Sequence, residues 1–389
     1  MKIAVATRAI APLHGHGGLE RAVADSCAAL AARGHDVTVF TATRTNREPF
    51  APLPFAVIAV PWGQLPLLRR GGVLDRAARY ARFTRRLAHA ITATNETYDI
   101  AIGHGAAAAA FVPLRATGRV HRLLLNPHGM EEFTAPPLKR AMLRGQRALV
   151  HRAATVADRV IATDAALVPA VIRNLGTPIT RIAVIPNGVN LAAIDRLAPA
   201  VAPALPPIIL SVGRIEANKG LDLLAAALGL IAPTLPSDWQ WHHIGEGAGR
   251  QRLTQAIATA GIGGPDHVHL HGALSDAALH ACFAHATLFV HPSRYEGSSL
   301  VTLEAMTHRL PVVAAAVGGI PDKVIPGETG WLVPPNDIQA LSEAIQEAFA
   351  MPVSALRAMG MRGRQRVETH FSLDHSTDLL LALITKLMQ

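Results

Sequence analysis

The chain has 389 residues, of which 50% are apolar, 17% are charged and only 4% are aromatic, and its formal net charge is +9. This length predicts two or three domains, and the scarcity of aromatic residues argues against an all-β fold. The positive charge suits anionic lipid or phosphorylated ligands. We expect no nucleic acid as a partner, because the sequence contains no helix-turn-helix, zinc-binding or RNP-type pattern.

No apolar run reaches the ~18 residues that span a bilayer, and the first residues resemble a strand rather than a secretory signal. We therefore expect a cytoplasmic protein that can associate peripherally with the inner face of the membrane. Cys27 and Cys282 lie far apart in apolar helical patterns, which predicts two buried thiols and no disulfide.

A strand–helix–strand pattern opens the chain, with strands expected at 2–7 and 37–41 and a helix at 19–33. This order predicts an α/β domain with a parallel sheet. Gly17-Gly18 precedes the helix, where backbone N–H groups can hold a phosphate. The pair does not fit a dinucleotide fingerprint, because it begins too far beyond the strand and Glu20 stands where a third glycine belongs. A flexible surface loop is the alternative interpretation.

Residues 65–91 form a basic amphipathic segment. At helical pitch, Leu87 and Ile91 lie on an apolar arc, whereas three arginines lie on the opposite arc and a fourth at its flank. A helix packed on its own domain explains this pattern. The sharper hypothesis is contact with anionic lipid head groups. The arginines concerned are Arg76, Arg79, Arg82 and Arg86.

Two further strands are expected at 99–102 and 122–125, and each ends at a polar junction. The second runs into Asn126-Pro127-His128-Gly129, which places His128 at the carboxyl end of a strand. Ligands bind at that edge of open α/β sheets. His128 is therefore a candidate site residue, with a purely structural histidine as the alternative. The elements expected to complete this domain are a helix at 139–154 and strands at 159–163 and 182–185.

Residues 198–207 consist of Ala, Pro, Leu and Val with four prolines, which marks a linker between domains. A second α/β pattern follows. His267, His269 and His271 alternate along one expected strand, but no carboxylate or cysteine accompanies them at a ligand spacing, so we expect no metal site there. The elements expected in this half are strands at 208–212, 239–244, 268–271, 288–290, 311–315 and 331–333, and helices at 338–350 and 373–389.

The segment from His291 to Met306 is the most informative part of the sequence. A buried strand leads into a loop that contains Glu296, and a helix is expected to open at Ser298 or Ser299. Serine at a helix start satisfies backbone N–H groups, and the same helix start attracts an anion. Glu304 lies about two turns beyond Glu296 at helical pitch. These residues predict a site for a phosphate-bearing, hydroxyl-rich ligand.

Six separated motifs occur along the chain: Gly17-Gly18-Leu19-Glu20-Arg21, His128-Gly129, Gly213-Arg214, Lys219-Gly220, Glu296 to Glu304 spaced as E-x7-E, and Gly318-Gly319. Together, and in this order, they resemble glycosyltransferase family 4, and the resemblance covers essentially the whole chain. Members of that family are retaining, nucleotide-sugar-dependent enzymes of the GT-B architecture. The resemblance implies an α/β fold of two Rossmann-like domains with parallel sheets facing across a cleft, and a C-terminal helix that returns to the N-terminal domain.

The domain bounds implied by the resemblance are an acceptor-binding domain at 1–197, the linker at 198–207, a nucleotide-sugar-binding domain at 208–370 and a helix at 371–389 that packs across the seam. The implied function is transfer of a hexose-type sugar from a UDP- or GDP-sugar to a glycan or lipid-linked acceptor, in cell-envelope polysaccharide or lipopolysaccharide synthesis. Two other classes stay open. One is a non-catalytic sugar-nucleotide-binding protein, and the other is a nucleotide-sugar epimerase or oxidoreductase, against which the missing dinucleotide fingerprint argues.

The resemblance also implies a role for each site residue. Arg214 and Lys219 are expected to hold the pyrophosphate as a divalent metal does elsewhere, so we expect neither a metal nor a cofactor. Glu304 is expected to accept hydrogen bonds from the ribose and Glu296 from the transferred sugar, with His128 near the 6-position of that sugar. The positions expected to complete the donor site are Gly17, Gly18, Gly297, Ser298, Ser299 and Leu300.

The expected chemistry is front-face substitution with retention, in which the departing phosphate assists deprotonation of the acceptor hydroxyl. No enzymic nucleophile is then required. A glycosidase would need a carboxylic acid and a carboxylate on either side of the glycosidic bond, whereas a set of Arg, Lys and helix N–H groups suits a phosphorylated donor.

Overall fold

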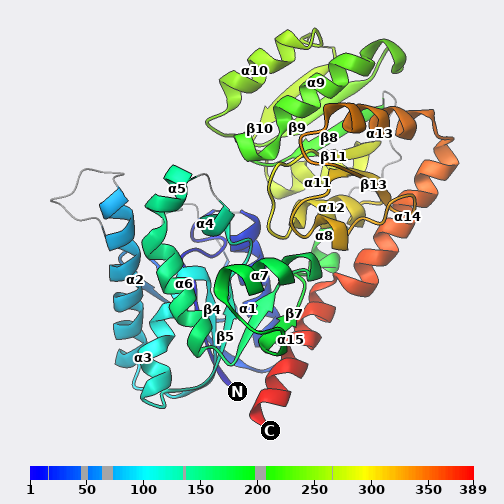
Figure 1. Ribbon diagram of the computed structural model, residues 1–389. Helices are drawn as coiled ribbons and strands as arrows, with labels where there is room; N and C mark the ends of the chain where they lie inside the picture. Colours follow the sequence, from blue (N-terminus) through cyan, green and yellow to red (C-terminus); the bar gives the residue numbers. More distant parts are fainter. Residues whose placement is uncertain (16, 45–50, 64–72, 135–136, 198–206, 265) are drawn as a thin grey trace. The chain divides into compact units, whose positions relative to one another are not determined.

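The structure is a computed structural model that describes residues 1–15, 17–44, 51–63, 73–134, 137–197, 207–264 and 266–389. The chain divides into two compact units (Figure 1). The first unit comprises Met1–Gly188 together with Leu373–Gln389, and the second comprises Val189–Ser372. Each unit is an α/β domain built on one parallel sheet, as the sequence predicted.

The strands described in the first unit are β1 (Lys2–Ala6), β2 (Asp36–Ala42), β3 (Ala56–Val60), β4 (Tyr98–His104), β5 (Val120–Asn126), β6 (Arg159–Ala162) and β7 (Ile182–Val184). They form one sheet in the order β3-β2-β1-β4-β5-β6-β7, and the neighbouring strands pair in parallel. Parallel sheets are covered on both faces, so their strands are runs of apolar residues. Accordingly, Ile3, Ala4 and Val5 of β1 are all buried.

The helices described in the first unit are α1 (Gly18–Ala32), α2 (Val73–Ala93), α3 (Phe111–Ala116), α4 (Glu131–Thr134), α5 (Pro137–Met142), α6 (Arg144–Val156), α7 (Val168–Leu175) and α15 (Leu373–Met388). They cover both faces of the sheet. Ala4 of β1 shares a hydrophobic core with Leu87 of α2. Ile3, which points to the opposite face, shares another with Leu30 of α1 and Ile384 of α15.

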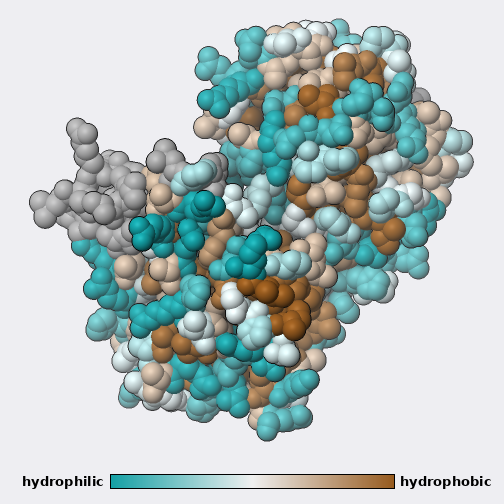
Figure 2. Space-filling view, viewed as in Figure 1, coloured by the Kyte–Doolittle hydropathy of each residue, from teal (hydrophilic) through white to brown (hydrophobic). Residues whose placement is uncertain are grey.

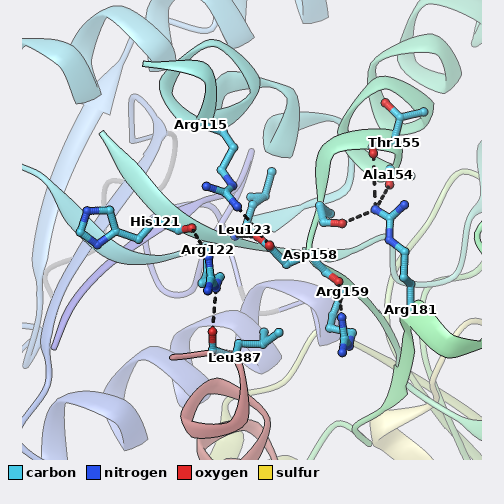
Figure 3. A network of polar contacts seen from close by, with 11 residues as sticks. Arg115, His121, Arg122, Leu123, Ala154, Thr155, Asp158, Arg159, Arg181 and Leu387 are labelled. Carbon is cyan, nitrogen blue, oxygen red and sulfur yellow. Dashed lines mark hydrogen bonds and ion pairs between the residues drawn. The ribbon is translucent and has the colours of Figure 1, made fainter. Parts of the chain in front are cut away.

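The last helix, α15, returns to the first unit, which confirms that expectation. It packs against α1, where the Arg33 guanidinium lies 3.0 Å from the carboxylates of both Asp374 and Asp378. At the other end of α15, Arg122 Nε donates to the Leu387 carbonyl at 2.7 Å (Figure 3). A cation at the carboxyl end of a helix satisfies free carbonyls and complements the helix dipole.

A group of arginines seen in Figure 3 holds the sheet together where β6 begins, away from the carboxyl ends of the strands. Asp158 accepts a hydrogen bond from the Leu123 amide at 2.8 Å and pairs with Arg115 at 3.1 Å. Arg181 donates to the carbonyls of Ala154 and Ala157 at the end of α6. Part of the positive charge of this unit therefore has structural partners.

The strands described in the second unit are β8 (Ile208–Val212), β9 (Gln240–Ile244), β10 (Val268–Gly272), β11 (Leu288–His291), β12 (Val312–Ala315) and β13 (Gly330–Val333). They form a parallel sheet in the order β10-β9-β8-β11-β12-β13. Trp241, Leu224 and Ile345 lie in its hydrophobic core. The helices described here are α8 (Leu191–Leu197), α9 (Leu221–Ile231), α10 (Arg250–Thr259), α11 (Asp276–His285), α12 (Leu300–Thr307), α13 (Ile338–Ala350) and α14 (Val353–His370).

Some elements differ from the sequence-based expectations. The helix expected at 139–154 is two helices, α5 and α6, with Leu143 between them. The strand β3 and the helix α14 were not anticipated. The expected domain bounds of 1–197 and 208–370 differ from the observed division at α8, which belongs to the second unit, where Asp195 pairs with Arg364 at 2.7 Å. Residues 198–206 of the expected linker lie outside the described residues.

Among the helices that the structure describes, none combines the length and apolarity needed to span a bilayer. The amphipathic helix expected within 65–91 is α2, and Phe83, Leu87 and Ile91 form its buried face. Arg86 Nη1 donates to the Pro61 carbonyl at 2.7 Å, so this arginine fastens α2 to its own unit. Residues 64–72 and the side chain of Arg76 lie outside the described part of the chain.

Candidate functional site

The predicted site residues follow strands near the point where each sheet reverses its strand order. In the first sheet β1 and β4 meet at this point, and in the second sheet β8 and β11 do. Ligands of open α/β sheets bind there, outside the carboxyl ends of the strands. Gly17-Gly18 follows β1, Lys219 follows β8 and Glu296 follows β11, whereas His128 follows β5, the neighbour of β4.

Lys219 and Glu296 form an ion pair in the second unit. The chain turns after β8 so that Gly220 lies against the backbone that follows β11. Gly220 has φ +65°, and a Cβ at this position would lie 2.0 Å from the Pro292 carbonyl oxygen, so only glycine permits this approach. This close packing brings Lys219 to Glu296, although 77 residues separate them along the chain.

Three donors converge on one oxygen of the Glu296 carboxylate. Besides Lys219 Nζ, His291 Nε2 lies 2.8 Å from Oε1, and Ser293 Oγ donates to it at 2.9 Å. Burial by itself raises the pKa of the Glu296 carboxyl, but hydrogen bonds and charge from His291 and Lys219 outweigh it and hold this pKa well below its usual range. Glu296 is therefore an ionised acceptor of hydrogen bonds and unsuited to donate a proton as a general acid.

The loop between Glu296 and α12 packs against the second glycine pair. Gly318 has φ +55°, and a Cβ there would lie 2.2 Å from the Glu296 carbonyl oxygen. The Gly319 amide donates to the Gly297 carbonyl at 2.8 Å. The pair Gly318-Gly319 thus fixes the backbone that leads to the start of α12.

The helix start predicted at Ser298 or Ser299 is confirmed, because Ser299 is the N-cap of α12. The expected capping by its hydroxyl is wrong, since Ser299 Oγ accepts from Thr302 Oγ1 at 2.9 Å and caps no backbone amide. Backbone N–H groups at Leu300 and beyond therefore lack a side-chain cap. An uncapped helix start of this kind favours an anion.

Lys323 is not among the residues predicted from the sequence, and it is fully buried behind the start of α12. Its Nζ donates to Ser298 Oγ and to the Gly319 carbonyl, both at 3.1 Å. Lys323 thereby joins the two loops and adds positive charge near the helix start. Its place four residues after Gly319 was the one signal available in the sequence.

One predicted residue, Arg214, lies apart from this hydrogen-bonded set. Arg214 is exposed, and its Nη1 donates to Glu216 Oε1 at 2.8 Å. Glu304 is buried within α12. The structure therefore brings together Lys219, Glu296 and the loop that opens α12, whereas Arg214 is directed to a local surface partner.

In the first unit, Gly17 is the N-cap of α1 and Gly18 its first residue, and both are exposed. His128 follows β5 with φ +55°, and its amide donates to Asn126 Oδ1 at 3.0 Å. His104, which the sequence analysis did not select, ends β4, and its Nδ1 lies 2.8 Å from His128 Nε2.

Comparison with known proteins gives the family. The model described as "Glycosyltransferase Family 4" matches residues 16–193, and the model described as "Glycosyl transferases group 1" matches residues 198–366. The chain belongs to glycosyltransferase family 4. The first match ends within α8 and the second begins directly after this helix, so together they cover most of both α/β units of this family member.

Two curated relatives and one solved structure illustrate the similarity. This family member is 31% identical over 183 residues to the lipopolysaccharide core biosynthesis mannosyltransferase LpcC of Rhizobium leguminosarum bv. viciae, with 45% of this chain and 50% of that protein aligned. It is 26% identical to the α-1,3/1,6-mannosyltransferase ALG2 of Homo sapiens over 402 residues, 96% of this chain and 94% of the relative. The match to LpcC thus spans half of that protein's length.

The solved sucrose-phosphate synthase (tll1590) from Thermosynechococcus elongatus superposes with a TM-score of 0.81 and 27% identity, covering 99% of this chain and 98% of that chain. This similarity extends over both parallel sheets, which confirms the predicted GT-B fold.

Proposed function

We propose that this family member is a retaining glycosyltransferase that moves a hexose-type sugar from a UDP- or GDP-sugar to a glycan or lipid-linked acceptor, in the synthesis of cell-envelope polysaccharide or lipopolysaccharide. The observation that carries the proposal is the Lys219–Glu296 ion pair beside the uncapped start of α12. It combines a cation and free N–H groups for a diphosphate with a fixed anionic acceptor for sugar hydroxyls.

These groups can stabilise the charge that develops during sugar transfer. As the bond between the sugar C1 and the phosphate oxygen breaks, negative charge grows on the leaving diphosphate. The Lys219 ammonium and the N–H groups at Leu300 stabilise that charge, with Arg214 as a second cation from the adjacent loop. Glu296 stays ionised and accepts from hydroxyls of the sugar, and Glu304 accepts from the ribose.

Retention requires the new bond to form on the face that the leaving group departs from. The acceptor oxygen bonds to C1 as the C1–O bond to the diphosphate breaks, and the hydroxyl proton passes to the departing phosphate oxygen. Every atom and charge then balances without an enzymic nucleophile. The diphosphate is neutralised by Lys219 and Arg214 rather than by a divalent metal, so this proposal includes no metal or other cofactor.

The relatives support the sugar and pathway classes of the proposal. LpcC and ALG2 are both mannosyltransferases by name, and LpcC acts in lipopolysaccharide core biosynthesis. A hexose donor and an envelope glycan acceptor are therefore the first choices for this chain.

A transfer assay tests the proposal. The purified protein is incubated with a panel of UDP- and GDP-hexoses and with lipid-linked or core-oligosaccharide acceptors, and release of the nucleoside diphosphate is followed. We expect turnover with one donor, a product of the same anomeric configuration by NMR, and undiminished rate in EDTA. An inverted product, or a strict need for a divalent metal, would overturn the mechanism.

The distribution of charge supports an anionic acceptor. The residues of the first unit include 25 Lys and Arg against 13 Asp and Glu, which gives +12, and those of the second include 12 against 15, which gives −3. The net positive charge of the chain therefore comes from the first unit, which is the one expected to bind the acceptor. A phosphorylated or lipid-linked glycan suits such a surface.

The same unit carries apolar surface. Figure 2 shows brown surface over α7 and β7, where Ile172, Ile179 and Val184 are exposed. This apolar surface lies at the β7 edge of the sheet, whereas α2 packs at the opposite edge, on β2 and β3, so the argument for lipid contact through α2 is the basic charge of this unit. We accordingly propose peripheral contact with anionic lipid, through α2 and its arginines Arg76, Arg79, Arg82 and Arg86.

Vesicle flotation tests this contact. We expect binding to vesicles that contain phosphatidylglycerol, no binding to phosphatidylcholine alone, and weakening by salt. The double variant Arg79→Gln, Arg82→Gln should lose binding; Arg86 is retained because it donates to the Pro61 carbonyl. The matched control changes Arg250 and Arg252 of α10, in the second unit, to Gln. Equal binding by both double variants would refute the proposed surface.

A further inference from the structure

Two histidines meet at the carboxyl edge of the first sheet. His104 is the last residue of β4, and Asn126, its partner in the register of β4 and β5, lies two residues before His128. His104 Nδ1 and His128 Nε2 are 2.8 Å apart, and the rings stack with centroids 5.0 Å apart and an angle of 21° between their planes. The left-handed backbone of His128 and its bond to Asn126 Oδ1 hold this geometry.

The two imidazoles line one cavity of about 50 Å³. A site that holds a water molecule needs roughly 10–15 Å³ by the same measure, so this cavity accepts a group of hydroxymethyl size. Its lining includes Asn126, Asn187 and Ser376, and none of its lining side chains carries a carboxylate, an ammonium or a guanidinium. Ser376 Oγ of α15 is buried and has no hydrogen-bond partner among the described residues. The lining therefore suits a neutral, hydroxylated guest.

Both histidines are neutral at physiological pH. Burial lowers the pKa of His104 to about 4. Burial, and then the charge of His104, lower the pKa of His128 well below its usual value. Each neutral ring carries one N–H and one lone pair. The contact between Nδ1 and Nε2 therefore contains a single proton, donated by one ring to the other.

This single proton couples the outer nitrogens of the two rings. If His104 Nδ1–H donates, His128 has its proton on Nδ1, and His104 Nε2 keeps a lone pair. If His128 Nε2–H donates, the assignments are reversed. In both arrangements the pair offers one donor and one acceptor to a ligand, which matches a hydroxyl group, since a hydroxyl both donates and accepts.

We propose that His104 and His128 act as one hydroxyl-recognition unit, in which His104 fixes the tautomer of His128 and contributes to selectivity for the sugar half of the donor. This inference rests on the proposed function and extends it to a residue outside the family motifs seen in the sequence. It assigns the pair to a neutral sugar hydroxyl and leaves the diphosphate to Lys219 and the start of α12.

Two substitutions of His104 test the proposal. His104→Phe keeps an aromatic ring and removes both nitrogens, whereas His104→Asn places an amide near the position of Nδ1 and can donate or accept there. Circular dichroism and thermal unfolding establish that each variant is folded. Binding is then measured by calorimetry for the sugar nucleotide that the wild type turns over and for the corresponding nucleoside diphosphate.

We expect His104→Phe to weaken binding of the sugar nucleotide by about 10- to 100-fold, the range found when the orienting partner of a metal-ligating histidine is removed. Binding of the nucleoside diphosphate should be unchanged, and His104→Asn should restore most of the loss. Equal weakening for both ligands, no weakening, or no recovery in His104→Asn would overturn the proposal.

A spectroscopic measurement separates this proposal from the proposed function. In protein labelled with ¹⁵N-histidine, the shifts should show the same tautomer in both rings, with the proton on Nδ1 of His104 and of His128 or on Nε2 of both. The shifts of His128 should change in His104→Phe. This result is expected even if no sugar nucleotide binds. Unchanged His128 shifts in His104→Phe would refute the coupling whatever the protein catalyses.

Discussion

The two sheets reverse their strand order in the same way, but the polar side chains near the reversal differ in charge. In the second unit, Lys219 and Glu296 form an ion pair, and His291 and Ser293 donate to the same carboxylate. In the first unit, the corresponding edge carries neutral imidazoles, those of His104 and His128. One topology thus supports an ionic site in one unit and a neutral site in the other.

The net charges of the two units do not follow the charges at their strand ends. The unit with the neutral pair carries +12, whereas the unit with the ionic site carries −3. The cation proposed to act on the donor diphosphate, Lys219, follows a strand of the negatively charged unit, whereas Arg115 and Arg181 of the first unit have partners within the fold. The net charge of a unit therefore informs on non-specific binding to its surface, whereas the chemistry of a site depends on the few side chains placed there.

Removing the ammonium group of the ionic site should have the largest effect. Lys219→Ala deletes the cation that we propose to face the leaving diphosphate, so kcat/KM for transfer should fall by about 10²–10³-fold, as for loss of one preorganised donor. The matched control is Arg250→Ala, which breaks the exposed pair of Arg250 with Glu246 and should leave the rate unchanged. Turnover of Lys219→Ala at the level of that control would contradict the site assignment.

Removing the Glu296 carboxylate should lower the free energy of unfolding by more than breaking an exposed ion pair elsewhere. Glu296→Ala leaves Lys219, whose side chain is only 18% exposed, without its anion, and should lower the free energy of unfolding by about 3 kcal/mol. Arg33→Ala breaks exposed pairs with Asp374 and Asp378 in the first unit and should cost less than about 1 kcal/mol. Urea midpoints at constant m-value measure both, and equal losses would show that the two environments do not differ.

A smaller effect should come from the neutral imidazoles. Burial holds the pKa of His104 in the first unit, and of His243 in the second, at about 4, against an ordinary 6.5. Between these values the unfolded chain binds protons that the folded protein does not, so stability should fall as the pH decreases from 6.5 toward 4. Urea unfolding from pH 7 to 4.5 measures how the free energy of unfolding depends on pH. His104→Asn should make this dependence shallower, because the unfolded variant has one fewer imidazole to protonate. A flat profile would contradict the neutral assignment.

The sequence was most informative where chemistry and local structure coincide. Lys219, Glu296 and the helix start at Ser299 lie beside buried strands in a pattern of glycines, so their grouping in the second unit could be predicted. The parallel sheets could be predicted as well, because their strands are continuous apolar runs, as in Ile3 to Ala6.

The contacts missed are those that depend on strand register. His104 ends a strand whose partner leads to His128, and only the pairing of β4 with β5 places them side by side. Likewise, His291 lies in the segment that the sequence analysis selected, but its bond to Glu296 depends on how the loop after β11 folds back. Lys323 reaches Ser298 because two glycine loops pack together. None of these contacts can be predicted from the spacing of residues along the sequence.

The most direct test of the ionic site is calorimetric titration of the wild type and Lys219→Ala with UDP and GDP in the presence of EDTA. We predict that the wild type binds at least one of these diphosphates without a divalent metal, and that Lys219→Ala binds it more weakly by about 10-fold or more, equivalent to ~1.4 kcal/mol. Equal affinity of the two proteins, or binding by the wild type only after a divalent metal is added, would contradict the assignment of Lys219 to the donor diphosphate.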